Sequence, residues 1–148
     1  MSAVKTIRPR TDYNHGHMTT QTSAIKLYSW NVNGIRAAEK KGFLDWMRGA
    51  NADVVCVQET KAHPEQLSAD ILNPLGYYSA FASAEKKGYS GVATFSKVQP
   101  NKSVIGLGDA KFDHEGRTVI SEFERFVLFN IYFPNGGRGP EWVQHKLA

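Results

Sequence analysis

The pattern of hydrophobic and polar residues from position 25 onward predicts a strand, a helix and a second strand in succession. Residues 25–30 alternate between apolar and polar side chains, which is the period of a half-buried strand. Residues 36–48 place their apolar side chains broadly on one helical stripe. Residues 52–57 form a short apolar run with β-branched side chains, typical of a strand buried on both faces. This order predicts a βαβ-like unit with a nearly parallel pair of strands.

The rest of the chain has mostly strand-like patterns. A short helix is predicted over residues 64–72 and is closed by Asn73 and Pro74. Five strand-like segments then follow, separated by glycine-containing turns: 77–82, 91–96, 98–106, 118–124 and 125–133. A last helix is predicted from Pro140 onward, and no residue in it signals a helix end. We therefore expect the sequence to stop inside this element.

The first 23 residues lack periodicity, so we expect a disordered tail ahead of a domain that spans residues 24–148. The polar run from Thr19 to Ser23 supports this interpretation. Gly16-His17-Met18 resembles a vector remnant in front of a second start methionine. On that hypothesis residues 1–17 are foreign to the fold, and we place no functional residue in the tail.

Composition narrows the class of protein. The chain has 41% hydrophobic and 22% charged residues, as an ordinary globular domain does, and its net charge is only +4. A protein that coats DNA through overall positive charge is therefore not indicated, and phosphate contacts would have to be local. Cys56 is the only cysteine, which excludes an intrachain disulfide, and its apolar strand favours inert packing. No apolar run approaches the ~18 residues that span a bilayer, so we expect no membrane partner.

Polar segments follow the first two strands of the predicted unit. Asn31 and Asn33 lie in a turn with Gly34, and Glu59 lies in the segment 58–61, directly after the apolar run. Ligands in open α/β sheets bind beyond the carboxyl ends of the strands, so both segments would face one crevice. A carboxylate there needs a cation or hydrogen bonds, and Mg²⁺ accepts one or two carboxylates together with water and phosphate. Taken singly, each segment has a simpler interpretation, a turn or a solvated strand end; together they favour a shared site.

Two further segments carry side chains suited to phosphate. Tyr132 could donate a hydrogen bond to a phosphate oxygen, and Asn135 could orient a water or a phosphate. Turn chemistry by itself explains Asn135 but not Tyr132. Tyr89 and Ser90 lie in a glycine-flanked turn that suits phosphate and minor-groove contact, although a plain β-turn is the favoured interpretation of this segment taken alone.

Five segments, in this order along the chain, resemble the N-terminal half of the exonuclease III / apurinic-apyrimidinic (AP) endonuclease family. They are Ser29–Arg36, Val57–Lys61, Gly88–Val92, Glu115–Arg117 and Tyr132–Gly136. The first two alone indicate the wider endonuclease/exonuclease/phosphatase superfamily, and the others narrow the resemblance to its DNA-repair branch. The resemblance implies a four-layer α/β sandwich, two mixed sheets face to face with helices outside, present here as an incomplete N-terminal half.

An activity and a set of residue roles also follow from the resemblance. Members of the family cleave the phosphodiester 5′ to an abasic site in double-stranded DNA, and many act on blocked 3′ ends or as 3′→5′ exonucleases. Glu59 would bind Mg²⁺ or Mn²⁺, and Asn31 would share that metal site. Asn33, which stands where some members have Asp, is a further candidate ligand of the metal. Tyr132 would lie near the scissile phosphate with Asn135 beside it. DNA contacts are implied for Arg36, Lys61, Tyr89 and Ser90.

The sequence departs from the family pattern in two motifs. It lacks the later glycine-aspartate-x-asparagine motif, whose Asp orients or activates the attacking water, because Lys111 replaces the Asn in residues 108–111. The terminal serine-aspartate-histidine motif is also missing. Since each sheet of the family's sandwich takes strands from both halves, we expect exposed apolar faces, open strand edges and little or no turnover from this chain.

Two alternatives to a repair nuclease remain open. One is another phosphodiesterase or phosphatase of the same superfamily, and the other is a non-catalytic DNA-binding fragment. For the full-length protein the resemblance implies a monomer, located in the cytoplasm of a bacterium or in the nucleus of a eukaryote.

Overall fold

The structure is a computed structural model that describes residues 5–7, 24–135 and 139–147. The larger of its two sheets has the strand order β1-β2-β3-β5-β4, and the smaller has the order β6-β7-β8. The larger sheet contains β1 (Lys5–Ile7), β2 (Ile25–Asn31), β3 (Val54–Gln58), β4 (Tyr78–Ala82) and β5 (Val92–Ser96). The smaller sheet contains β6 (Lys102–Ile105), β7 (Thr118–Glu122) and β8 (Val127–Ile131). The helices are α1 (Ile35–Lys40), α2 (Phe43–Ala50), α3 (Ala69–Leu72), α4 (Ala110–Asp113) and α5 (Pro140–Leu147), with a 3-10 turn, η1 (Pro64–Gln66).

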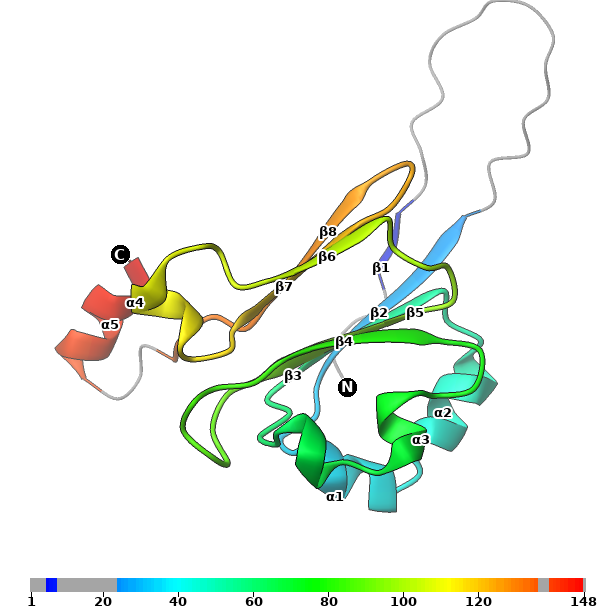
Figure 1. Ribbon diagram of the computed structural model, residues 1–148, viewed down its shortest axis with the longest axis horizontal. Helices are drawn as coiled ribbons and strands as arrows, with labels where there is room; N and C mark the ends of the chain where they lie inside the picture. Colours follow the sequence, from blue (N-terminus) through cyan, green and yellow to red (C-terminus); the bar gives the residue numbers. More distant parts are fainter. Residues whose placement is uncertain (1–4, 8–23, 136–138, 148) are drawn as a thin grey trace, which may run out of the picture.

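The elements are arranged in three layers within the described residues. Helices α1 to α3 lie on one face of the larger sheet, and the smaller sheet lies on the other face (Figure 1). Strand β8 packs over β3 and β5, and β7 packs over β4 and β5. The predicted parallel pair is present as β2 and β3, with Asn31 opposite Gln58 at its end. None of the described helices is long and apolar enough to cross a membrane.

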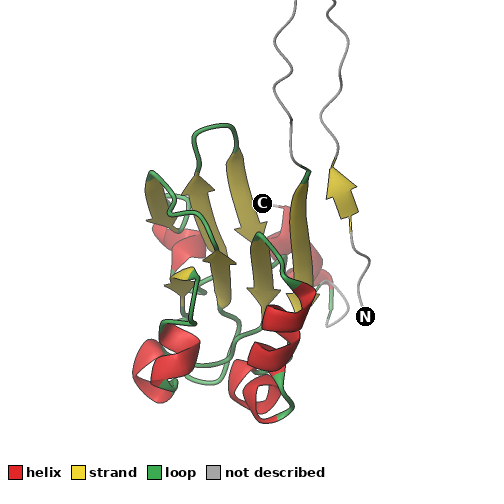
Figure 2. Ribbon diagram, turned by 90° about the vertical axis from the view of Figure 1, so that its right-hand side faces the viewer, coloured by secondary structure: helices red, strands yellow, loops and turns green. Residues whose placement is uncertain are grey.

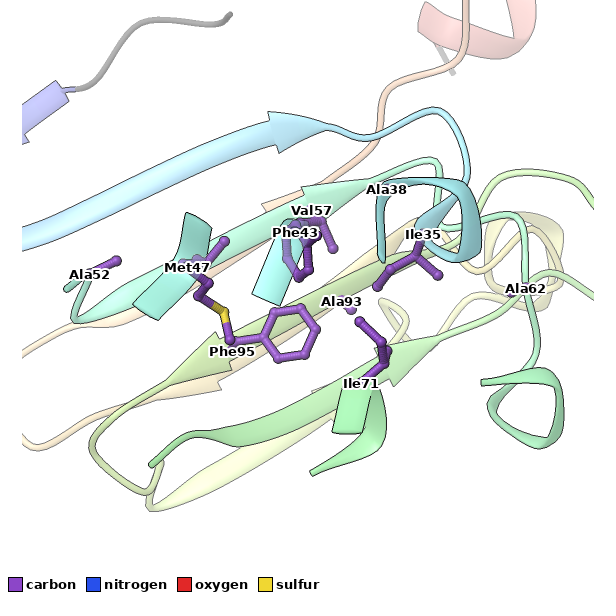
Figure 3. Close-up of a cluster of buried hydrophobic side chains, with 11 residues drawn as sticks. Ile35, Ala38, Phe43, Met47, Ala52, Val57, Ala62, Ile71, Ala93 and Phe95 are labelled. Carbon is purple, nitrogen blue, oxygen red and sulfur yellow. The ribbon is translucent and has the colours of Figure 1, made fainter. Parts of the chain in front are cut away.

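The hydrophobic core lies between the helices and the larger sheet (Figure 3). Alternation along β3 turns Val55 and Val57 toward this layer, where Phe43 and Met47 of α2 meet Phe95 of β5. Each of these side chains is at most 1% exposed. Burial of side chains of this size contributes about 1.5–3 kcal/mol apiece, so this layer supplies most of the apolar stabilisation.

Local chemistry explains where the predicted elements differ from the observed ones. The helix predicted over 36–48 is divided into α1 and α2, because Gly42 takes a left-handed conformation with φ of 87°. The strand predicted over 98–106 begins only at Lys102, two residues after Pro100, which has no N–H to donate. Helix α4 was not predicted; the side chain of Asp109 caps it by accepting a hydrogen bond from the N–H of Lys111.

Three residues of the N-terminal tail form a strand, β1, which pairs antiparallel with the edge of β2 (Figure 2). In this register Lys5 lies opposite Leu27, and Ile7 lies opposite Ile25. An edge strand presents unpaired N–H and C=O groups, and pairing with β1 satisfies some of them. The expectation of a disordered tail therefore does not hold for residues 5–7; the rest of the tail lies outside the described residues.

The outer face of β8 is apolar and exposed, as expected from the sequence. Val127 is 51% exposed and Phe129 is 57% exposed, whereas Asn130 between the two sheets is buried. This alternation shows that one face of β8 packs on the larger sheet while the other carries apolar side chains into solvent.

A polar contact joins β8 of the smaller sheet to β3 and β5 of the larger sheet. The side-chain amide of Asn130 donates from Nδ2 to the backbone oxygen of Ala93 at 2.9 Å and to Thr94 Oγ1 at 3.2 Å. Its Oδ1 accepts a hydrogen bond from Gln58 Nε2 at 2.8 Å. Asn130 is 2% exposed, so these partners replace the water it has lost. One side chain of β8 thereby fixes the position of β3 and β5.

We predict that Asn130→Ala lowers the free energy of unfolding by about 2–3 kcal/mol, because it leaves buried donors and acceptors without partners. Urea unfolding at neutral pH measures this change through the transition midpoint. Asn101→Ala, at an exposed position, is the matched control and should change the free energy by less than about 0.5 kcal/mol. A loss no larger than that of the control would show that the amide does not join the sheets.

Candidate active site

The packing of the smaller sheet on the larger one determines which polar side chains meet at one end of the molecule. Asn130 faces the larger sheet and contacts Gln58, the last residue of β3. Tyr132, two residues further along, points in the same direction because side chains alternate along an extended segment. Its hydroxyl reaches Glu59, the residue directly after Gln58. A candidate site is therefore assembled where β2, β3 and β8 end.

Glu59 is the centre of this assembly. Its Oε1 accepts hydrogen bonds from Asn31 Nδ2 at 2.7 Å and from the Tyr132 hydroxyl at 2.8 Å. Its Oε2 lies 2.9 Å from Lys61 Nζ. Lys61 also donates to Asn33 Oδ1 at 2.5 Å, and the N–H of Asn33 donates to Asn31 Oδ1 at 3.1 Å. All five residues come from segments that the sequence singled out, and the structure places them in direct contact.

The backbone around Glu59 is held in an uncommon conformation. Glu59, Lys61 and Asn33 have φ values of 55°, 50° and 48°, in the left-handed region that few non-glycine residues adopt. Strain of this kind persists only where neighbouring groups determine the conformation, and it is concentrated at functional sites.

Hydrogen bonds from two flanking segments hold this backbone. The N–H of Lys61 donates to the carbonyl of Ser90 at 2.9 Å, and the N–H of Gly34 donates to the carbonyl of Glu59 at 2.7 Å. Thr60 is fixed against Gly91, whose φ is 86°; a Cβ at Gly91 would overlap Thr60 Oγ1. The glycine thus permits the close approach of the two turns.

The protonation states of the two central groups are set by their neighbours. Burial raises the pKa of Glu59, but hydrogen bonds from Asn31, Lys61 and Tyr132, together with the charge of Lys61, outweigh it and lower the pKa to about 2. Burial raises the pKa of Tyr132, and the hydrogen bond to ionised Glu59 raises it further. At neutral pH the site therefore contains a carboxylate and a protonated phenol that donates to it.

A pocket of about 250 Å³ opens beside these groups. Its lining consists of Glu59, Lys61, Gly88, Tyr89, Ser90, Arg117, Tyr132 and Asn135. The turn that carries Tyr89 and Ser90, predicted to contact DNA, thus lies at the same cavity as Tyr132 and Asn135. Ser90 itself is 1% exposed and Tyr89 is partly buried.

Arg36 lies apart from this pocket, on α1, in a neighbouring groove of about 510 Å³. The groove is lined by Gly34, Arg36, Ala37, Glu39, Lys40, Thr60, Lys61 and Gln66. Lys61 borders both cavities. The basic side chains of the groove, Arg36 and Lys40, therefore adjoin the pocket that contains Glu59.

Sequence reasoning assigned no role to one residue that lines the pocket, or to its ion-pair partner. Arg117 lines it with a side chain that is only 8% exposed, and Glu115 forms an ion pair with Arg117 at 2.5 Å. Both belong to a segment that contributed to the family resemblance. Arg117 directly precedes β7, and the β7–β8 register, had it been known, would have placed it opposite Tyr132.

Cys56 takes no part in this site. Its thiol is buried in β3, and burial raises its pKa to about 12, partly opposed by a hydrogen bond from Thr94. A protonated, inaccessible thiol is a poor nucleophile, as the apolar pattern of its strand indicated.

Comparison with known proteins identifies the family. The sequence model of the endonuclease/exonuclease/phosphatase family matches residues 28–147. The chain belongs to this family. The resemblance to its exonuclease III / AP endonuclease branch is confirmed by curated relatives.

Two relatives and one solved structure illustrate the similarity of this chain to known proteins. An exodeoxyribonuclease of Bacillus subtilis is 41% identical over 124 residues, which are 83% of this chain and 48% of the relative. A DNA-(apurinic or apyrimidinic site) endonuclease of Dictyostelium discoideum is 37% identical over 128 residues, 86% of this chain and 35% of the relative. The solved structure of an AP endonuclease from Archaeoglobus fulgidus superposes with a TM-score of 0.69 at 27% identity, over 83% of this chain and 47% of that one. The α/β sandwich fold is thus confirmed, and the chain spans about half the length, or less, of these relatives.

The depressed pKa of Glu59 predicts a specific pH dependence of stability. The unfolded chain takes up a proton on Glu59 near its ordinary pKa of 4.5, whereas the folded chain resists protonation down to about 2. The stabilisation is therefore complete above about pH 5 and is lost as the pH falls toward 2. Urea midpoints between pH 7 and pH 3 should fall more steeply for the wild type than for Glu59→Gln.

Glu85→Gln, which removes an exposed carboxylate, is the control and should follow the wild-type curve. Parallel curves for the wild type and Glu59→Gln would contradict the prediction.

Proposed function

We propose that this chain carries the metal-binding and phosphate-contacting part of a DNA-repair nuclease that hydrolyses the phosphodiester 5′ to an abasic site in duplex DNA. Removal of blocked 3′ ends and 3′→5′ exonuclease action belong to the same proposal. The observation that carries it is the convergence of Asn31, Lys61 and Tyr132 on the single carboxylate of Glu59. The names of the relatives from Bacillus subtilis and Dictyostelium discoideum support this substrate class.

The residues present suit a hard divalent cation, Mg²⁺ or Mn²⁺. With its pKa lowered to about 2, Glu59 is ionised at neutral pH, and a cation, the ammonium of Lys61, already lies against its Oε2. No group of three or more His, Cys, Asp or Glu side chains gathers around a metal position in the described part of the chain. A single carboxylate, that of Glu59, suits Mg²⁺, which retains several waters and binds through one or two carboxylates and substrate phosphate.

Glu59 and Asn31 would hold the ion. The Asn31 amide donates from Nδ2 to Glu59 and accepts at Oδ1 from the Asn33 N–H, so it would have to turn before its oxygen faced the metal. When bound, the ion would neutralise charge on the phosphoryl group and its leaving oxygen. Asn33 supports the site through its neighbours: its Oδ1 accepts a hydrogen bond from Lys61, and its N–H donates to Asn31. It does not donate to the carboxylate of Glu59 itself.

The other site residues that the resemblance implies position the substrate. The raised pKa of Tyr132 keeps its hydroxyl protonated at neutral pH, so it can donate a hydrogen bond to a phosphate oxygen. Lys61 and Arg36 place positive charge along two adjoining cavities, as contact with a DNA backbone requires. Asn135, Tyr89 and Ser90 border the cavity from two other turns.

In the intact protein, Glu59→Gln should reduce incision of a duplex with a single abasic site at least ~100-fold at low Mg²⁺, because it removes the charged ligand. Raised Mg²⁺ or Mn²⁺ should restore part of the activity by mass action. Glu85→Gln is the control, since it removes an exposed carboxylate outside the pocket lining. Unchanged incision at low Mg²⁺ would eliminate Glu59 as a metal ligand.

For the 148-residue chain alone, we predict salt-sensitive binding of duplex DNA without incision, because its sequence contains no motif that would orient the attacking water. Binding is measured by fluorescence anisotropy at two salt concentrations, and cutting by gel assay with and without EDTA. Cutting that EDTA abolishes would contradict the prediction of inactivity. In the intact protein, hydrolysis of a phosphoinositide in preference to abasic DNA would assign it to another branch of the superfamily.

A further inference from the structure

Arg117 is a buried cation to which the proposed reaction gives no task. Its side chain is 8% exposed, and three of its N–H groups donate to three different residues. Nε donates to Glu115 Oε2 at 2.5 Å, and Nη2 donates to the hydroxyl of Tyr89 at 2.8 Å. Nη1 donates to the backbone oxygen of Tyr132 at 3.1 Å. The planar guanidinium is thus fixed in one orientation at the pocket wall.

The charge of Arg117 is compensated where it lies. Glu115 is itself only 12% exposed, and it accepts hydrogen bonds from Arg117 at Oε2 and from the Tyr89 hydroxyl, at 3.2 Å, at Oε1. Arg117, Glu115 and Tyr89 therefore close a ring of hydrogen bonds. A guanidinium paired in this way satisfies its own partners and retains little net charge for a substrate phosphate.

Arg117 contacts Tyr132 through both its main chain and its guanidinium group. The N–H of Tyr132 donates to the backbone oxygen of Arg117 at 2.9 Å, one position beyond the last pair of the β7–β8 ladder, Thr118 with Ile131. The guanidinium carbon lies 4.9 Å from the centre of the Tyr132 ring and 5.6 Å from that of the Tyr89 ring. Main chain and ring of Tyr132 are thus both held by one residue.

We propose that Arg117 is a positioning residue that holds the Tyr132 hydroxyl against Glu59, and that Glu115 and Tyr89 fix Arg117 in turn. A tyrosine side chain has only two main torsions, so a fixed backbone and a fixed ring determine where its hydroxyl lies. That hydroxyl is 2.8 Å from Glu59 Oε1. The proposal depends on the proposed function only in assuming that Tyr132 meets the scissile phosphate.

A double-mutant cycle on the 148-residue chain tests the contact without requiring any activity. Tyr132→Phe removes only the hydroxyl, so it should lower the urea midpoint of the wild type by breaking the hydrogen bond to Glu59. In an Arg117→Lys background the same change should leave the midpoint almost unaltered, because the guanidinium no longer fixes the aromatic ring of Tyr132 and its hydroxyl is no longer held against Glu59. An equal lowering in both backgrounds would overturn the proposal.

Two further variants keep this test decisive. Lys102→Met removes an exposed cation from β6 of the same sheet, and in that background Tyr132→Phe should have its full effect. Tyr89→Phe removes the hydroxyl that accepts from Arg117 and retains the ring, so it decides the question if Arg117→Lys does not unfold cooperatively. The effect of Tyr132→Phe should shrink in the Tyr89→Phe background, and an undiminished effect there would count against the proposal.

In the intact protein, incision kinetics separate positioning from direct substrate binding. Arg117→Lys should lower kcat ~10-fold and leave KM within ~2-fold, with no further loss when Tyr132 is already Phe. A rise in KM at unchanged kcat, or additive losses in the double variant, would assign Arg117 to substrate contact and overturn the proposal. Absence of incision by the wild type would instead refute the proposed function, while the unfolding cycle would still decide the role of Arg117.

Discussion

An ionised carboxylate held at the junction of two sheets is the constraint on which the candidate active site depends. Burial disfavours the charged form of Glu59, and donors from separate segments reverse that preference. One donor comes from the end of β2, one from the turn after β3 and one from the residue after β8. The charge is therefore fully stabilised only when both sheets are packed together, so the site and the sandwich assemble as one unit.

The two faces of the larger sheet are packed by different kinds of interaction. On the helix side, Phe43, Met47 and Phe95 supply nondirectional apolar burial, which tolerates small shifts of one element on another. On the side of the smaller sheet, Asn130 and Gln58 form directional hydrogen bonds that a shift of one residue would break. The polar layer thus fixes the position of the smaller sheet on the larger one, and that position places Tyr132 beside Glu59.

Much of the architecture could be predicted from the sequence, because strong periodic patterns encode it. The alternation at residues 25–30 and the apolar run at 52–57 predicted the parallel pair, and the polar residues after both strands indicated the shared site. What could not be predicted depends on partners far apart in the sequence. The left-handed backbone at Glu59 arises from hydrogen bonds between turns, and β1 forms because β2 offers an open edge. Arg117 gives no local sign of its role, which only the pairing with Tyr132 reveals.

The left-handed backbone at Asn33, Glu59 and Lys61 affects how substitutions in this site should be chosen. For a residue with a Cβ this conformation costs roughly 1–2 kcal/mol, asparagine and aspartate bear it best, and β-branched side chains fit it poorly. Alanine at these positions removes the hydrogen bonds that hold the turn and also changes the conformational preference of the chain. Its effect on activity would combine chemistry with geometry. Replacements that keep length and shape, such as amide for carboxylate, separate the two.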